Sequence, residues 1–408
     1  MTERLGRWPA HYFVVLLLCA AVFISYIDRT NISVGAIAMQ ARLGWSETQK
    51  GMVLSSFFIG YMLMMMAGGA LANRYGGKVV LGLAVVWWSL CTVLTPPAAL
   101  VSMPVLIAAR VALGLGEAAV FPASFNMISR WVPPLQVSRA VALLASMVSL
   151  GPVFALPVTG ALIRDYGWPV PFYAFGAVGL IWAVIWFAGV RAGSGVNVRD
   201  SGPPPAIPWA RLLHLPAVWA IVVAHFAFNW SLYVMLAWLP SYFKSTFGVT
   251  IASAGLLSAA PALAAFVMAN VAGHVADRLL RAGRSATAVR KAMTATGLAA
   301  AAGFLLLVPL ATTVTTGVVL MSCASGSAAI AVAGFPPNCF DIAPRYADVI
   351  YSFSNTFATL PGIFGVFITG WLFDRTGGFA AGFYLTAGVS VVAALVFLVF
   401  GSGARQIE

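Results

Sequence analysis

Charged residues are scarce in this sequence. Asp, Glu, Lys and Arg make up only 8% of its 408 residues, whereas a soluble domain is nearer to a quarter charged. Hydrophobic residues make up 61%, and the mean hydropathy is +0.94. This composition excludes an ordinary water-soluble protein, and it predicts an all-α protein that crosses a lipid bilayer several times.

Residues that build metal, disulfide or nucleic-acid sites are also few. The four cysteines lie in apolar runs without metal-ligand spacing, and the four histidines are scattered. The net charge of +12 comes from bases spread singly through short loops. We therefore expect no metal, cofactor or nucleic acid. We find no nucleophile with a partner base, so we do not expect an enzyme.

Apolar stretches long enough to span a bilayer as helices recur twelve times. They cover residues 11–36, 48–72, 79–97, 103–130, 138–163, 170–190, 215–243, 250–275, 291–310, 313–338, 347–372 and 379–402. No small-residue cleavage site follows the first, so we expect an uncleaved span. A polar segment rich in Gly, Ser and Pro follows the sixth. These features predict a six-helix bundle over 1–190, a cytoplasmic linker over 191–214 and a second six-helix bundle over 215–408.

The two predicted bundles carry matching segments. GALANR at 69–74 follows the second span, and GHVADR at 273–278 follows the eighth. GALIRDYG at 160–167 follows the fifth span, and GWLFDRTG at 370–377 follows the eleventh. Two pseudo-symmetric halves with a binding site between them are typical of transporters that work by alternating access.

The loop charges predict the orientation. With both termini in the cytoplasm, sixteen of the 23 Lys and Arg residues lie on the inner side and five on the outer side. An excess of bases marks cytoplasmic loops. We therefore expect a multi-pass protein of the cell's inner membrane with both termini cytoplasmic.

Four ionisable residues lie deep inside predicted spans, namely Asp28, Arg29, Arg110 and Glu117. Each costs at least about 2.5–3.5 kcal/mol near the bilayer centre, so a purpose is expected for them. They are either parts of a transport site or an ion-pair network that joins the first span to the fourth. Arg110 and Glu117 are seven residues apart and share a helix face, whereas Asp28 points about 100° away from Arg29.

The charges of these four residues cancel. An incoming carboxylate would meet guanidinium groups, whose geometry suits it, and would leave the site with one negative charge too many. A proton on Glu117 or Asp28 would restore neutrality. The sequence therefore suggests symport of an organic anion with protons.

The remaining polar residues inside spans are neutral. Asn229 and Tyr233 share a face of the seventh span, Asn355 lies on the eleventh, Tyr61 on the second and Ser146 on the fifth. These residues are candidates for contacts with the substrate. Ordinary hydrogen bonds between helices are the alternative.

Several motifs resemble those of a known family. GALANRYGGK at 69–78 resembles the loop signature of the major facilitator superfamily, with Asn73 where that family has Asp. YIDRTNIS at 26–33, the stretch 109–134 and FNWSLYVMLAWLPSYF at 228–243 resemble the anion:cation symporter family within it. The resemblance implies the major facilitator fold, with twelve transmembrane helices in two six-helix bundles.

The resemblance also implies roles. Asp28 and Glu117 match the acids of proton coupling, Arg29 matches the base that contacts the substrate carboxylate, and Arg110 matches a base of the network. Other residues stand at family positions in the cavity or the gating loop, with departures at Ser146 and Asn73: Tyr26, Tyr61, Ser146, Asn355, Gly69, Asn73, Arg74, Asp277 and Arg278. Sugar-acid carriers have Gln where Ser146 stands, and this departure argues against galactonate specificity. Glutamate carriers have Arg where Phe228 stands, and this departure argues against a second carboxylate subsite and favours a monoanion.

The sequence thus predicts a monomeric secondary transporter that imports a sugar acid or a related monocarboxylate with protons. Aromatic acids and tartrate-like hydroxy acids are alternative substrates. Proton-driven efflux by the same fold and a membrane sensor are alternative functions. The paired arginines argue against the export of cations, and the short tail carries no signalling domain.

The substitution Asn73→Asp tests the gating loop. The loop Asp of the family is thought to brace the outward-facing state through its charge, which Asn lacks. We expect Asn73→Asp to shift the population outward, as measured by the accessibility of engineered cysteines. An unchanged accessibility pattern would contradict this expectation.

Overall fold

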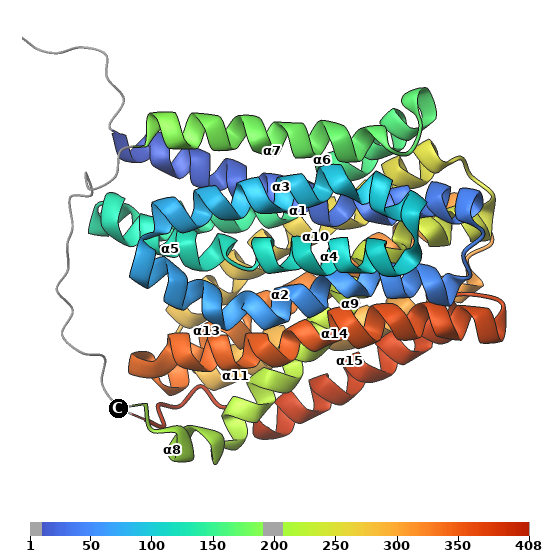
Figure 1. The fold of residues 1–408 in the computed structure, drawn as a ribbon. Coiled ribbons are helices and arrows are strands. Elements are labelled where there is room, and N and C mark those ends of the chain that lie inside the picture. Colours follow the sequence, from blue (N-terminus) through green and yellow to red (C-terminus); the bar gives the residue numbers. More distant parts are fainter. Residues whose placement is uncertain (1–9, 191–206, 408) are drawn as a thin grey trace, which may run out of the picture. The chain divides into compact units, whose positions relative to one another are not determined.

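The computed structural model describes residues 10–190 and 207–407, and over these residues every regular element is helical (Figure 1). Eleven of the described helices are long and apolar enough to cross a membrane, and the bent helix α2 brings the number to twelve. The predicted all-α membrane fold is therefore confirmed. The chain is a multi-pass membrane protein.

Most of the helices run longer than the predicted spans, because polar residues extend many of their ends, whereas those at 170–189 and 380–400 are slightly shorter. The first seven are α1 (Ala10–Leu43), α2 (Glu47–Tyr75), α3 (Gly77–Val101), α4 (Met103–Glu117), α5 (Val120–Trp131), α6 (Val137–Tyr166) and α7 (Val170–Gly189). The others are α8 (Trp209–Leu213), α9 (Pro216–Phe247), α10 (Ile251–Arg281), α11 (Ala286–Leu307), α12 (Val314–Ile330), α13 (Phe335–Ile342), α14 (Ala347–Thr376) and α15 (Ala380–Phe400).

The fourth and tenth predicted spans are broken helices. The break between α4 and α5 lies at 118–119, and Pro122 follows it. Proline has no N–H to donate, and its ring clashes with the carbonyl group four residues earlier, here that of Ala118. A 3₁₀ turn, Ala331–Ala333, likewise separates α12 from α13 just before Pro336. The break therefore recurs in the second half of the chain.

The described chain packs as two units, which cut across the sequence halves. The first unit is Met1–Asn31, Ile59–Ala155 and Pro169–Pro204. In it α3 packs against α4, α5 and α7. Trp182 and Trp186 of α7 stack at 5.0 Å, and their indole N–H groups donate to backbone carbonyls of Leu17 and Lys78. These bonds anchor α7 beside α1 and the start of α3.

The second unit is Ile32–Phe58, Leu156–Trp168 and Pro205–Glu408. Its helix α9 lies beside α14 and α15 (Figure 1), and α10 packs on α12. Phe335, Phe397 and Leu298 lie in its core. Of the predicted linker, 191–206 lies outside the described residues, and α8 follows it. The division into 1–190, 191–214 and 215–408 remains a prediction.

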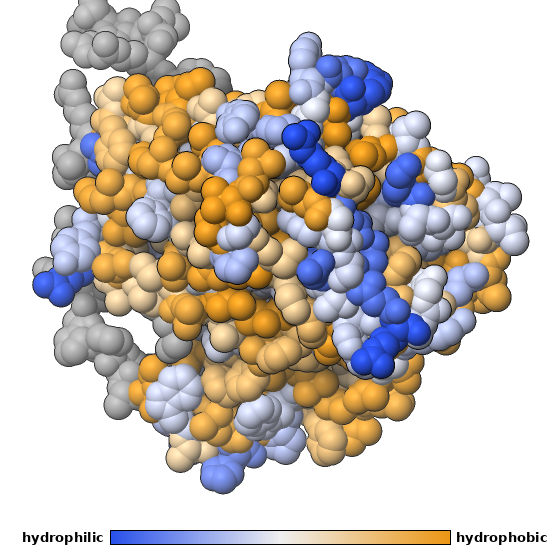
Figure 2. All heavy atoms as spheres, turned by 45° about the vertical axis from the view of Figure 1, so that its right-hand side comes forward, coloured by the Kyte–Doolittle hydropathy of each residue, from blue (hydrophilic) through white to orange (hydrophobic). Residues whose placement is uncertain are grey.

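Large apolar side chains cover much of the molecular surface. Figure 2 shows them over most of one face, with hydrophilic groups gathered toward its right-hand side. Leu63, Val184 and Val399 are 65%, 69% and 67% exposed. Apolar side chains this exposed suit the hydrocarbon of a bilayer rather than water.

Candidate functional site

Four buried charges gather in the first unit, as the sequence predicts. Asp28 and Arg29 of α1 and Arg110 and Glu117 of α4 are each at most 6% exposed. They form one electrostatic group, because Asp28 interacts with Glu117 and Arg110, and Arg110 interacts with the other three. Because the four groups are buried, a change in the charge of one alters the electrostatic energy of the other three.

The central contact of the cluster is the ion pair of Arg29 and Glu117. Arg29 donates to Oε2 of Glu117 from Nη2 at 3.0 Å and from Nε at 3.3 Å. The hydroxyl of Ser25, one turn before Arg29, donates to the same oxygen at 2.8 Å. Three donors thus converge on one carboxylate oxygen. The sequence analysis missed Ser25, although its i, i+4 spacing from Arg29 places it on the same face.

Two aromatic rings support the guanidinium group. The Cζ atom of Arg29 lies 4.7 Å from the ring centroid of Tyr26 and 4.7 Å from that of Tyr61 on α2. At this distance the ring faces attract a cation without neutralising it. Gly151 of α6 allows a close approach here, since a Cβ atom at 151 would lie 2.6 Å from Cβ of Tyr26. The rings therefore orient Arg29 and leave its charge available to an anion.

Asp28 has different surroundings from Glu117. It is 0% exposed, and the side chains of Trp88 and Thr92 on α3 lie beside it. Neither carboxylate oxygen of Asp28 accepts a hydrogen bond of normal geometry, and the Trp88 indole N–H likewise has no such partner. Asp28 therefore faces the neighbouring helix α3 and, as its direction about 100° away from Arg29 predicts, is not part of the Arg29 ion pair. The two acids of the cluster are chemically distinct.

Arg110 lies on the same buried side of α4 as Glu117. Gly116, which lies between them, allows α4 to approach α3 closely, since a Cβ atom at Gly116 would lie 2.7 Å from the Trp87 ring and 3.2 Å from Cβ of Trp88. The indole N–H of Trp87 also donates to the carbonyl of Ala112 at 2.7 Å. This tight packing fixes the helix that carries two of the four charges.

The neutral candidates are spread over both units. In the second unit, Asn229 and Tyr233 share a face of α9, as predicted. The Asn229 amide donates to the Ala358 carbonyl of α14 at 2.8 Å and to the Tyr233 hydroxyl at 3.4 Å. Asn229 thus makes the interhelical bond that was the alternative to a substrate contact. Asn355 is half-buried on α14. In the first unit, the Ser146 hydroxyl donates to its own helix at Ala142.

His225 is a buried polar residue that the sequence analysis missed. Its Nδ1 atom lies 3.0 Å from the hydroxyl oxygen of Ser354, and its ring packs on Phe335 and Tyr351. It lies one turn before Asn229, so the two side chains form successive polar contacts between α9 and α14. The signal was the i, i+4 spacing of His225 and Asn229.

The gating-loop residues are mostly exposed. Asn126 of α5 donates to Oδ1 of Asn73 at 3.2 Å and accepts from the backbone N–H of Gly77 at 3.0 Å. Arg74 lies over the ring of Tyr75. Gly69 lies half-buried on α2, and Asp277 and Arg278 lie exposed on α10. Asn73 therefore connects α2 to α5 within the first unit.

The described residues hold no group of three or more His, Cys, Asp and Glu that could bind a metal ion. A bundle of membrane-spanning helices with broken helices and a buried cluster of opposite charges defines a secondary transporter. The sequence pattern of the Major Facilitator Superfamily matches residues 18–366. The chain belongs to this superfamily.

Plant anion transporters are among its curated relatives. "Probable anion transporter 4, chloroplastic" of Oryza sativa subsp. japonica is 37% identical, over 100% of this chain and 72% of the relative. "Ascorbate transporter, chloroplastic" of Arabidopsis thaliana is 35% identical over 98% and 77%. "Sodium-dependent phosphate transport protein 1, chloroplastic" of Arabidopsis thaliana is 35% identical over 98% and 81%. The family and these relatives are transporters, not enzymes, which confirms the predicted class.

Solved structures share the fold. An inward-facing, occupied bacterial homologue of the human lysosomal transporter Spinster matches with a TM-score of 0.82 and 19% identity, over 97% of each chain. A D-xylose–proton symporter matches with a TM-score of 0.76 and 16% identity, over 97% of this chain and 100% of the other. These matches confirm the major facilitator fold.

Removing one partner of the buried ion pair is expected to destabilise the protein more than removing both. Glu117→Leu leaves Arg29 buried beside Ser25 without its counter-charge, which costs about 3–5 kcal/mol. Combining it with Arg29→Met removes that charge, and the thermal midpoint in detergent should recover part of the loss. The matched control is the exposed pair Arg164–Asp165, where Asp165→Leu should not shift the midpoint. A double variant that is less stable than either single variant would contradict this role for the pair.

Proposed function

We propose that this transporter imports an organic monoanion, such as a sugar acid or a related monocarboxylate, together with protons by alternating access. The observation that carries the proposal is the Arg29–Glu117 pair. A guanidinium group supported by two aromatic rings is held by an internal carboxylate, which occupies the place that a substrate carboxylate would take. The anion-transporter names of the relatives also support it.

Competition for Arg29 would couple the anion to a proton. A substrate carboxylate that binds Arg29 displaces Glu117, whose remaining direct donor is then Ser25. A buried carboxylate without its counter-charge takes up a proton more readily, because the neutral form avoids the cost of an unpaired charge. Glu117 thus becomes protonated as the anion binds. The loaded cluster remains neutral and can pass through an occluded state.

Asp28 would serve as a second proton site. Its carboxylate accepts no hydrogen bond of normal geometry and interacts electrostatically with Glu117 and Arg110. Protonation of Asp28 would therefore break no ion pair, whereas protonation of Glu117 weakens one. One proton site tied to Arg29 and a second one independent of it are consistent with one or two protons per anion.

The surroundings favour a singly charged substrate. Phe228 stands where related glutamate carriers have Arg, and its ring packs 5.8 Å from that of Phe335, so this position provides no second cation. Tyr233 and Asn355 remain candidates for contacts with substrate hydroxyl groups. Relatives named for ascorbate and for phosphate extend the panel of anions to test. We place the protein in the cell's inner membrane with both termini cytoplasmic, on the distribution of its loop bases.

Proton uptake in proteoliposomes tests the proposal. With a pH dye inside, we expect acidification when the correct anion is added outside, from a panel of sugar acids, hydroxy acids, aromatic acids, ascorbate and phosphate. Glu117→Gln should abolish anion-driven acidification, because it keeps the hydrogen-bonding shape but cannot cycle a proton. It should retain anion exchange across the membrane.

The matched control is Asp341→Asn. Asp341 also pairs with an arginine, Arg290 at 2.7 Å, but lies outside the cluster, so acidification should persist. Acidification that survives in Glu117→Gln would contradict proton coupling through this residue. Alkalinisation on addition of a substrate outside would indicate proton-driven efflux instead.

A further inference from the structure

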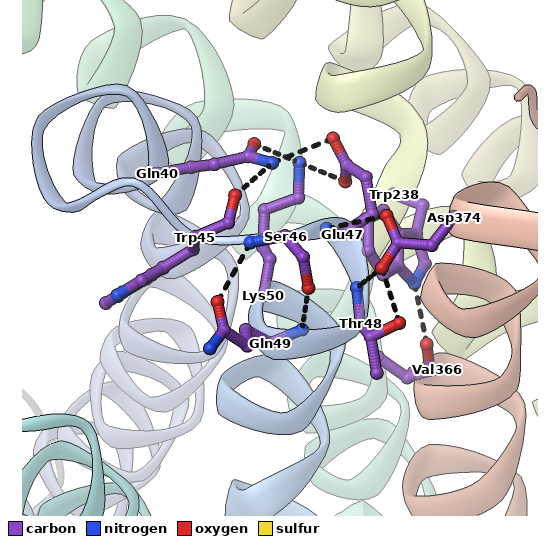
Figure 3. A network of polar contacts seen from close by, with 10 residues as sticks. All are labelled: Gln40, Trp45, Ser46, Glu47, Thr48, Gln49, Lys50, Trp238, Val366 and Asp374. Atoms are coloured by element: carbon purple, nitrogen blue, oxygen red, sulfur yellow. Dashed lines mark hydrogen bonds and ion pairs between the residues drawn. The ribbon is translucent and has the colours of Figure 1, made fainter.

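A second polar network surrounds the start of α2 (Figure 3). It joins the end of α1, the loop that follows and the first turn of α2 to Trp238 of α9 and Asp374 of α14, all within the second unit. In the proposed orientation it lies on the outer side of the membrane. None of its members belongs to the charged cluster of Arg29 and Glu117.

The α2 N-terminus is capped by a residue from a distant part of the chain. Oδ1 of Asp374 accepts from the backbone N–H of Glu47 at 3.1 Å. Its Oδ2 accepts from the backbone N–H of Thr48 at 2.8 Å and from the Thr48 hydroxyl at 2.5 Å. The first N–H groups of a helix have no partner within the helix, and its positive end attracts a carboxylate. Asp374 supplies both the acceptor oxygens and the negative charge, although it lies more than 320 residues away in the sequence.

A buried lysine adds a second connection. Lys50 is 1% exposed, although it was counted from the sequence as an outer loop base. Its Nζ atom bonds to Oε2 of Glu47 at 2.6 Å and to Oε1 of Gln40 at 2.8 Å, and it lies 5.0 Å from the Trp238 ring centroid. The indole N–H of Trp238 donates to the carbonyl of Val366 on α14. Lys50 thereby ties the start of α2 to α9.

Glycine permits the close approach of these helices. A Cβ atom at Gly370 of α14 would overlap the carbonyl oxygen of Glu47 and lie 2.9 Å from the Trp238 ring. A Cβ atom at Gly51 of α2 would lie 3.3 Å from the same ring. Any side chain at 370 would push the end of α14 away from the start of α2. The cap therefore depends on one small residue as well as on one charge.

The equivalent position in the first half of the chain has no such contact. Asp165 stands in GALIRDYG as Asp374 stands in GWLFDRTG, at the end of α6. Its side chain is 45% exposed and pairs with its neighbour Arg164. The helix α10 is capped by its own Thr250, which accepts from the N–H of Ser253. Only one of the two related acids caps a distant helix.

We propose that Asp374, with Thr48 and the Lys50 contacts, is a latch that holds the outer ends of α2 and α14 together and must release before the outer side of the transporter opens. The carboxylate can reach the two N–H groups only while the end of α14 lies against the start of α2. Asp374 is already exposed to water in this state, so release replaces its bonds to the helix N-terminus with bonds to water. The latch sets the balance between conformations and goes beyond the proposed substrate and proton chemistry.

Cysteine reactivity tests the latch. Leu54 is 4% exposed, and it lies between Gly51 and Phe58 on the side of α2 that faces α9 and α14. In Leu54→Cys, a membrane-impermeant maleimide added outside should react slowly, because the site is covered. Adding Asp374→Asn should raise the labelling rate roughly twofold to fivefold, since the charge that binds the exposed helix N-terminus is lost. Protein without Leu54→Cys gives the background from the four native cysteines.

Matched variants keep the test specific. Asp165→Asn removes the equivalent carboxylate and should leave the rate unchanged. Gly370→Val should raise the rate by wedging the helices apart, whereas Gly378→Ala, where a Cβ atom meets nothing within 4 Å, should not. If Asp374→Asn lowers expression or the thermal midpoint, Thr48→Val provides the test, because it removes one of the three bonds and should give a smaller increase.

The proposal would be overturned if Asp374→Asn and Gly370→Val were labelled no faster than their controls, Asp165→Asn and Gly378→Ala. If Asp374→Asn is unstable, a labelling rate for Thr48→Val equal to that of the controls would overturn the proposal. The measurement needs neither substrate nor a proton gradient. Its failure would therefore leave the proposed transport function standing, and the failure of anion-driven acidification would leave the latch standing.

Discussion

Charge neutrality in a low-dielectric interior is the constraint on which the rest of this structure depends. Arg29 and Glu117 are each almost fully buried, and removing the charge of one makes the buried charge of the other costly. Ser25, Tyr26 and Tyr61 add directional support but no net charge. The formal charges of the cluster cancel, and under the proposed function an anion that enters it is matched by a proton.

The backbone supports the same arrangement. Glu117 is the last residue of α4, because the helix breaks before Pro122, and α4 is held against α3 through Gly116. The break recurs before Pro336, where no charge is present. The interrupted helix is thus a property of both halves of the chain. Only in the first half does an ionisable residue, Glu117, end the helix at the break. Broken helices next to the binding site are a recurrent device of secondary transporters.

The sequence predicted the twelve spans, because each is a long apolar stretch. It also predicted the clustering of four charges, because a charge within an apolar stretch is conspicuous. It did not predict the hydroxyl of Ser25, the burial of Lys50 or the contact of His225 with Ser354. Their partners depend on how each helix is rotated about its axis. A helix that is apolar on all sides carries no periodic signal to fix that rotation. Neither helix break was predicted, because 103–130 and 313–338 were predicted as continuous spans although Pro122 and Pro336 stand inside them.

Asp165 and Asp374 occupy equivalent places in a duplicated chain but have unequal partners. The difference between the two halves therefore lies in the partner of the acid and not in the acid itself. It separates two properties that natural selection acts on. The resting conformation can be adjusted at one carboxylate near the membrane surface, while the residues that recognise the cargo stay untouched. Carriers with identical binding residues can therefore differ in the side of the membrane to which the empty binding site is open.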